Sequence, residues 1–196
     1  MSKADPASQK KERNKAVRWV VTIFLVTICV SATISLVSEE IMAVSGMAVA
    51  FVILLAIIFV GIVFDVVGVA VTSADERPFH SMAARKVPGA RESIRLLRNA
   101  ERVSSICNDV VGDICGVVSG SASATIAAQI LHKFEFSWPS VVSLAMSALV
   151  AGLTVGGKAI GKTFAINSST SIVHGVGKII YFFHNIPYSF KKNKTK

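Results

Sequence analysis

Four long runs without a charged residue constrain this chain more than any other feature. They cover residues 19–38, 41–64, 114–131 and 136–157. A helix that crosses the hydrocarbon of a bilayer needs roughly 20 mostly apolar residues, and ionised side chains are costly there. Four runs of about this size leave too little polar sequence to cover them as buried helices of a soluble protein. The runs therefore predict an all-α, polytopic integral membrane protein.

The composition of the chain agrees with this prediction and excludes two other classes. Hydrophobic residues make up 52% of the chain and charged residues only 17%, whereas an ordinary soluble domain is about 25% charged. A soluble globular protein is therefore disfavoured, and the apolar content excludes intrinsic disorder for most of the chain. The formal net charge of +9 resembles that of a nucleic-acid-binding protein, so the positions of the basic residues decide its meaning.

The basic residues are distributed as the positive-inside rule requires. All but one of the 21 Lys and Arg residues lie before the first run, between the second and third runs, or after the fourth. The exception is Lys133, between the third and fourth runs. This alternation predicts a multi-pass protein of the cell membrane with both termini in the cytoplasm. The positive charge is therefore explained by the orientation of the chain in the membrane, and no nucleic acid is needed to explain it. The predicted partner is the lipid bilayer.

The chain divides into two tails and one transmembrane domain. We expect a disordered basic tail at 1–15, a transmembrane domain at 16–185 and a basic tail at 186–196. The first run lacks a convincing cleavage site before Glu39, so it is interpreted as a retained helix and not as a signal peptide. The predicted spans lie at about 16–38, 42–72, 104–131 and 138–160. Amphipathic helices are expected at about 79–102 and 169–185, lying near the headgroups or packed on other protein.

Motifs that would indicate an enzyme are weak. Residues 156–163 satisfy the G-x-x-x-x-G-K-[ST] pattern of a phosphate-binding loop, but they follow an uncharged run and not a strand. The chain that follows Thr163 is too short for a nucleotide-binding sheet. The three cysteines and four histidines are scattered without metal-ligand spacing. We therefore expect that the protein is not an enzyme.

Four polar residues fall inside or beside the predicted spans, and they are the candidate functional residues. Asp65 lies late in the second span, and Asn108, Asp109 and Asp113 lie early in the third. Because these spans are adjacent and antiparallel, we expect the four side chains at similar depth. Carboxylate and amide oxygens are the ligands that hard divalent cations prefer. The first hypothesis is therefore a site for Mg²⁺ or another divalent cation as transported substrate, with no certain cofactor.

A second interpretation of the same residues stays open. Lys158 and Lys162 lie at the cytoplasmic end of the fourth span, at a depth similar to that of the aspartates. Lys158 would then neutralise one of the aspartates, or the carboxylates would extend toward the cytoplasm. On this hypothesis the protein is a non-transporting scaffold or regulatory protein, with the ion site replaced by ion pairs between Lys158 and aspartate.

The third span also carries a face of small residues. Gly112, Gly116 and Gly120 are evenly spaced, four positions apart, and such spacing allows another helix to approach closely in lipid. The partner helix could belong to the same chain or to a second copy, so a homodimer through this face is one prediction. Asn108 lies on the same stripe, and we expect this face to press Asn108 against a neighbouring helix.

The order of these motifs resembles that of the transmembrane domain of the CorB/CorC bacterial magnesium exporters, which are related to the cyclin M transporters. Phe64–Ser73 ends an apolar span as a Phe-Ser-Ala-Ser-Glu-Thr-Ala-Leu-Thr-Ser-like stretch does in that family. A basic helical segment at 90–99 follows. The next segment, Ile106–Ile114, corresponds to the family's Gly-Asn-x-x-x-Asn span. The last, Gly157–Lys162, corresponds to its Gly-Glu-x-x-Pro-Lys motif. The resemblance covers about residues 45–185 and does not include the family's cytoplasmic CBS and CorC-type domains.

The resemblance implies a dimeric, sodium-linked transporter of divalent cations whose ion is held by polar groups of these spans. Asn108 matches the family's first motif asparagine, and Gly157 matches its motif glycine. Other motif positions differ in chemistry from the family pattern. In the first motif, Asp65 occupies the position of one serine, Val67 that of the other serine and Gly68 that of the glutamate. In the second motif, Gly112 occupies the position of the second asparagine. In the last motif, Lys158 occupies the position of the glutamate and Gly161 that of the proline.

Overall fold

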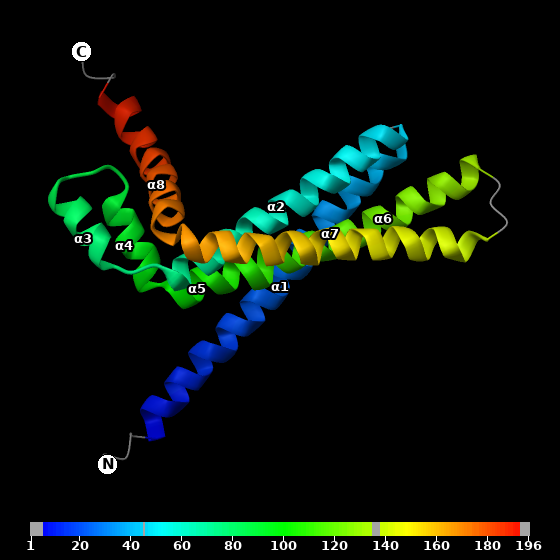
Figure 1. Cartoon of the computed structure of the whole chain (residues 1–196). Helices are drawn as coiled ribbons and strands as arrows, with labels where there is room; N and C mark the ends of the chain where they lie inside the picture. The colour runs from blue at the N-terminus through cyan, green and yellow to red at the C-terminus, as the bar shows by residue number, and fades with distance from the viewer. Residues whose placement is uncertain (1–5, 45, 135–137, 193–196) are drawn as a thin grey trace.

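The computed structural model describes the chain over residues 6–44, 46–134 and 138–192, and its side chains over 17–42, 46–134 and 138–184. Every regular element in these ranges is a helix, which confirms the all-α prediction (Figure 1). The predicted tail at 1–15 falls partly outside the described residues, and from Pro6 onward the chain is helical. The helices are α1 (Pro6–Val44), α2 (Met47–Ser73), α3 (Arg77–Ala84), α4 (Ala90–Arg98), α5 (Ala100–Ser105), the π-helix η1 (Ile106–Gly112), α6 (Asp113–Lys133), α7 (Pro139–Asn167) and α8 (Ser169–Lys192).

Four helical segments of the described chain are long and apolar enough to cross a membrane. They are Val17–Met42, Met47–Ser73, Ala100–Lys133 and Pro139–Asn167. The third segment is one continuous rod made of α5, η1 and α6. The fourth extends beyond the predicted end at residue 160, because a helix can continue through lysines once it has left the hydrocarbon.

The four long helices are unequally covered by the rest of the chain. In Figure 1, α2, α6 and α7 run along one another, while α1 crosses them and its N-terminal end points away from the bundle. In the most apolar 18-residue window of α1 no residue is buried within the chain, against 39% in that of the third segment. The apolar part of α1 therefore presents most of its side chains to lipid or to another protein, which fits a helix that is hydrophobic on all sides.

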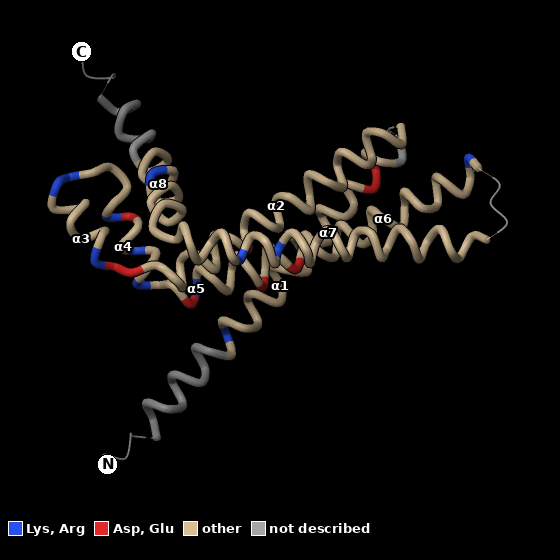
Figure 2. Tube along the Cα trace, viewed as in Figure 1, with Lys and Arg blue, Asp and Glu red and all other residues tan. Residues whose placement is uncertain are grey.

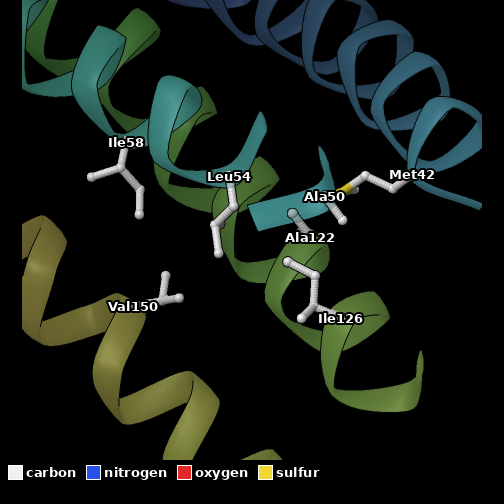
Figure 3. Packing of buried hydrophobic residues seen from close by; sticks show 7 residues of the cluster. All are labelled: Met42, Ala50, Leu54, Ile58, Ala122, Ile126 and Val150. Carbon is white, nitrogen blue, oxygen red and sulfur yellow. The ribbon is translucent and has the colours of Figure 1, made fainter. Parts of the chain in front are cut away.

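An apolar core joins the four long helices in the half of the bundle where α1 ends and α2 begins. Figure 3 shows its side chains, which come from all four long helices: Met42, Ala50, Leu54, Ile58, Ala122, Ile126 and Val150. A hydrogen bond also links α6 to α1 here, because the Gln129 Nε2 donates to the Met42 carbonyl oxygen at 2.9 Å. This half is held by packing of ordinary side chains and contains no buried charge among the described residues.

The segment predicted as one amphipathic helix at 79–102 is divided into α3, α4 and α5. The break before α4 contains Pro88 and Gly89, and Gly89 has a φ of 84°, which favours glycine. A second break occurs at Asn99, where the backbone leaves helical geometry. The division lets α4 pack against α8 and α3 pack against α4, at the opposite end of the bundle from the apolar core, and most charged residues of the described chain gather there (Figure 2).

A candidate intramembrane polar site

Charged residues of three spans lie at one level along the bundle. The stretches Met47–Asp65 of α2, Asp113–Lys133 of α6 and Pro139–Lys158 of α7 are similar in length. Each contains about 20 residues, which at a rise of about 1.5 Å per residue is close to the thickness of the hydrocarbon layer. Asp65, Asp113 and Lys158 therefore lie near one boundary of the membrane interior when the other ends of these helices lie at the opposite boundary.

Asp65 is buried and paired with Lys158. Only 7% of its side chain is exposed, against 24% for Lys158, and the Lys158 Nζ lies 3.5 Å from the Asp65 Oδ1. Gly112 makes room for the lysine, because a Cβ at that position would lie 3.3 Å from the Lys158 Nζ. The second carboxylate oxygen, Oδ2, is buried and has no hydrogen-bond partner among the described residues. The ion pair therefore satisfies only half of this carboxylate.

Asn108 packs against α2 at Gly68, close to Asp65 along the helix. A Cβ at Gly68 would overlap the Asn108 side chain, so the absence of a side chain at Gly68 is what admits the amide. The Asn108 Nδ2 donates a hydrogen bond to the Ser104 Oγ at 3.2 Å. Its Oδ1 is buried without a hydrogen-bond donor from the described chain. The expectation that Asn108 is pressed against a neighbouring helix is met here.

The helix that carries Asn108 is locally a π-helix. The seven residues of η1, Ile106–Gly112, have the wider i→i+5 geometry in place of the regular α-helix expected for this span. π-helical turns are rare and frequently occur at functional sites. The site thus combines an irregular backbone, a buried ion pair and two buried oxygens that lack donors among the described residues.

Asp109 and Asp113 face away from this site. Both residues are exposed on the surface of η1 and α6, and neither has an ion-pair partner among the described residues. In the same ranges no group of three or more His, Cys, Asp or Glu residues is arranged to hold a metal ion. Of the four predicted site residues, the structure places Asp65 and Asn108 in the interior about one turn of α2 apart, since Asn108 lies against Gly68, and it leaves Asp109 and Asp113 facing outward.

The three glycines of the third span also differ in their surroundings. Gly112 is buried beside Lys158, whereas Gly120 is exposed and a Cβ on Gly116 or Gly120 would meet nothing within 4 Å. A row of positions four apart rotates about 40° per step around an α-helix, because about 3.6 residues make one turn. Gly112 therefore serves packing within the chain, and only the part of the predicted face at Gly116 and Gly120 is open.

Two residues of the site were missed by the sequence analysis. Ser104 lies four positions before Asn108, and that spacing on one helix was a signal for the hydrogen bond they form. Gly68 lies three positions after Asp65, and in the sequence it stands out only as a departure from the family motif. The sequence leaves the partner of Lys158 open among the aspartates, and in the structure the partner is Asp65.

Comparison of the chain with protein-family models, with characterised proteins and with solved structures found no match. The resemblance to the CorB/CorC transmembrane domain therefore stays a prediction that rests on the residues quoted for it. The structure by itself defines the class of protein. Among the described residues it is all-helical, with four segments able to span a membrane and a small polar site between α2, η1 and α7.

Proposed function

We propose that this protein is a polytopic membrane protein that binds a cation between Asp65 and Asn108 and takes part in its transport. One observation carries the proposal: the Asp65 Oδ2 and the Asn108 Oδ1 are both buried and both lack a donor among the described residues. A buried acceptor without a partner is costly, and such atoms call for a bound donor, a water or a cation. Carboxylate and amide oxygens are ligands of hard cations such as Mg²⁺.

Lys158 would act as a competing cation that is part of the chain. With its ammonium beside Asp65 the pair is electrically neutral, so no free ion is needed to balance the buried carboxylate. The lysine side chain is long and 24% exposed, so it has a route away from the site. An arriving cation would take over the carboxylate, and Lys158 would return when the ion leaves.

The finer features of the proposal come from the sequence patterns. The resemblance to the CorB/CorC exporters implies a divalent, magnesium-like ion and a homodimer. The distribution of basic residues implies a cell-membrane protein with both termini in the cytoplasm. The site then lies near the cytoplasmic boundary of the hydrocarbon, where an ion from that side reaches it without crossing the membrane.

The test is a Mg²⁺ flux measurement on the full chain in proteoliposomes that enclose a magnesium-sensitive dye. We expect flux with the unmodified protein and a decrease of about tenfold or more with Asp65→Asn or Asn108→Ala, since each removes an oxygen ligand or its charge. Asp109→Asn and Asp113→Asn are the matched controls, because both residues face outward. Absence of flux, or flux indifferent to Asp65→Asn and Asn108→Ala, would reject the proposal.

A second candidate is a non-transporting scaffold or regulatory membrane protein, and the ion pair itself favours it. A carboxylate already held by Lys158 at 3.5 Å offers little to an ion from solution. The variant Lys158→Gln separates the two candidates. If the lysine competes with the ion, flux rises or its half-saturating Mg²⁺ concentration falls; if the site is closed for structural reasons, no flux appears with either chain.

A further inference from the structure

A pocket opens at the junction of the helices beyond the spans. It has a volume of about 310 Å³ and lies between the turn that joins α3 to α4 and the side of α8. Its walls combine two basic side chains, one acidic side chain and a tyrosine with small apolar groups: Ala83, Lys86, Val87, Pro88, Gly89, Arg91, Glu92 and Tyr181. This pocket is separate from the polar site inside the spans, and the inference drawn from it does not depend on the proposed function.

The chemistry of the pocket suits a phosphate group. Lys86 and Arg91 are exposed, and neither forms an ion pair with an acidic residue among the described side chains. The two basic groups outnumber Glu92, so the pocket has a net positive charge. The first turn of α4 begins at the same place without a side-chain cap, and its N–H groups add partial positive charge. Arginine and lysine with nearby N–H donors are the usual ligands of phosphate.

The frame of the pocket is held by backbone contacts between α4 and α8. A Cβ on Gly89 would lie 2.6 Å from the Lys178 backbone nitrogen, so the two backbones pass as closely as glycine allows. The Ser93 Oγ donates to the Gly89 carbonyl oxygen at 2.9 Å and lies 3.2 Å from that of Val173. Lys86 and Arg91 therefore project from a fixed frame, so their ordering costs less when an anion binds.

The surroundings of the pocket indicate a lipid and not a soluble phosphate. Residues 179–183 of α8 are all aromatic or aliphatic, and all are exposed; Phe182 and Phe183 are each 68% exposed. Tyr181, in the middle of this stretch, also lines the pocket. Because Tyr181 belongs to both, the basic pocket and this exposed apolar stretch lie side by side, as the phosphate and the acyl chains of a phospholipid do. We propose that this pocket binds the phosphate of an anionic phospholipid, with Lys86 and Arg91 as its ligands.

Native mass spectrometry of the full chain tests the proposal by counting lipids bound from mixed micelles. Phosphatidylglycerol is titrated against phosphatidylcholine, and glycerol 3-phosphate is added as the soluble headgroup. We expect saturable binding of phosphatidylglycerol, weakened about thirtyfold in the double variant Lys86→Gln/Arg91→Gln, which removes both direct charged ligands of the phosphate. The matched control is Arg85→Gln/Arg95→Gln, which removes the same charge from exposed positions outside the pocket. It should change the affinity less than about threefold, because exposed charges that do not contact the phosphate are screened.

Three results would overturn the proposal. Equal weakening by the two double variants would indicate attraction to the basic surface as a whole. Displacement of phosphatidylglycerol by glycerol 3-phosphate at equal concentration would assign the pocket to a soluble phosphate compound. Equal binding of phosphatidylcholine would show that the pocket does not distinguish lipid charge. Because all four substituted residues are exposed, we expect the unfolding temperature without lipid to be the same for all chains.

Discussion

The two halves of the helical bundle are packed by different means. In the half beside the start of α2, the interior consists of apolar side chains, and Leu54 and Ile126 are almost completely buried. In the other half, glycines admit polar side chains: Gly68 makes room for Asn108 and Gly112 for Lys158. A second apolar cluster lies beside these polar groups and consists of Ala70, Val71, Phe79, Ala165 and Val173. The first half is therefore stabilised mainly by apolar packing. The second combines such packing with a buried ion pair and two buried oxygens that lack donors among the described residues, and leaving those oxygens unpaired costs free energy.

The difference bears on the cation site proposed above. A buried oxygen without a donor adds no stability, so the ion pair and the two oxygens of the polar half are the features on which that proposal rests. The apolar half needs no such explanation, because its side chains fill the space between helices. Substitutions in the two halves should therefore differ in how much stability they remove and in whether a second substitution restores it.

The largest expected effect comes from Lys158→Met. This change leaves the buried Asp65 carboxylate without its cation, and breaking a buried pair costs about 3–5 kcal/mol. Thermal or SDS-induced unfolding in detergent measures the loss. The variant Asp65→Asn/Lys158→Met should regain most of it, since no uncompensated charge is left. Lys162→Met, one turn along the same helix at an exposed position, is the control and should stay within about 0.5 kcal/mol of the unmodified chain.

Failure of the double variant to recover stability would contradict this interpretation. In that case the cost would come from the shape of Lys158 and not from its charge. The polar half would then resemble the apolar half in the way it is held together.

Leu54→Ala probes the apolar half. Leu54 is 1% exposed and lies in the core shown in Figure 3, so its truncation leaves a cavity and should destabilise the protein by about 2–3 kcal/mol. No second substitution in the polar half should rescue it, because its contacts are local packing contacts. Val52→Ala, on the same helix with 65% exposure, is the matched control. Equal losses for the two variants in the same unfolding assay would argue against a packed apolar half.

The sequence predicted the fold class because the hydrocarbon excludes charge whatever the helices pack against. The four charge-free runs needed no knowledge of partners, and each corresponds to a long apolar helix. The helix ends were harder to predict, since charges are tolerated there: α1 continues through Glu39 and Glu40, and α7 continues through Lys158 and Lys162. Charged residues therefore do not mark where a helix ends.

The candidate site could be predicted only in part. The spacing of Asp109 and Asp113 places both on one side of a helix, but it does not say which side faces the interior. The π-helix at Ile106–Gly112 has no recognised sequence signal, and it contains Asp109 and ends just before Asp113. Asn108 was predictable because small residues on its stripe indicated a packed face. The pairing of Lys158 with Asp65 depends on the relative rotation of α2 and α7, which no local pattern specifies.

Two glycines in the spans differ in how closely another helix approaches them. Gly68→Ala places a methyl group where the Asn108 amide lies, and the overpacking should cost about 1–3 kcal/mol. Gly116→Ala meets nothing within 4 Å and should be neutral. Because Asn108 is the proposed ligand, Gly68→Ala should also lower Mg²⁺ flux or affinity more than its loss of stability explains. Unfolding and flux measured on both variants test this, and equal behaviour of the two glycines would mean that the close approach at Gly68 does not position Asn108.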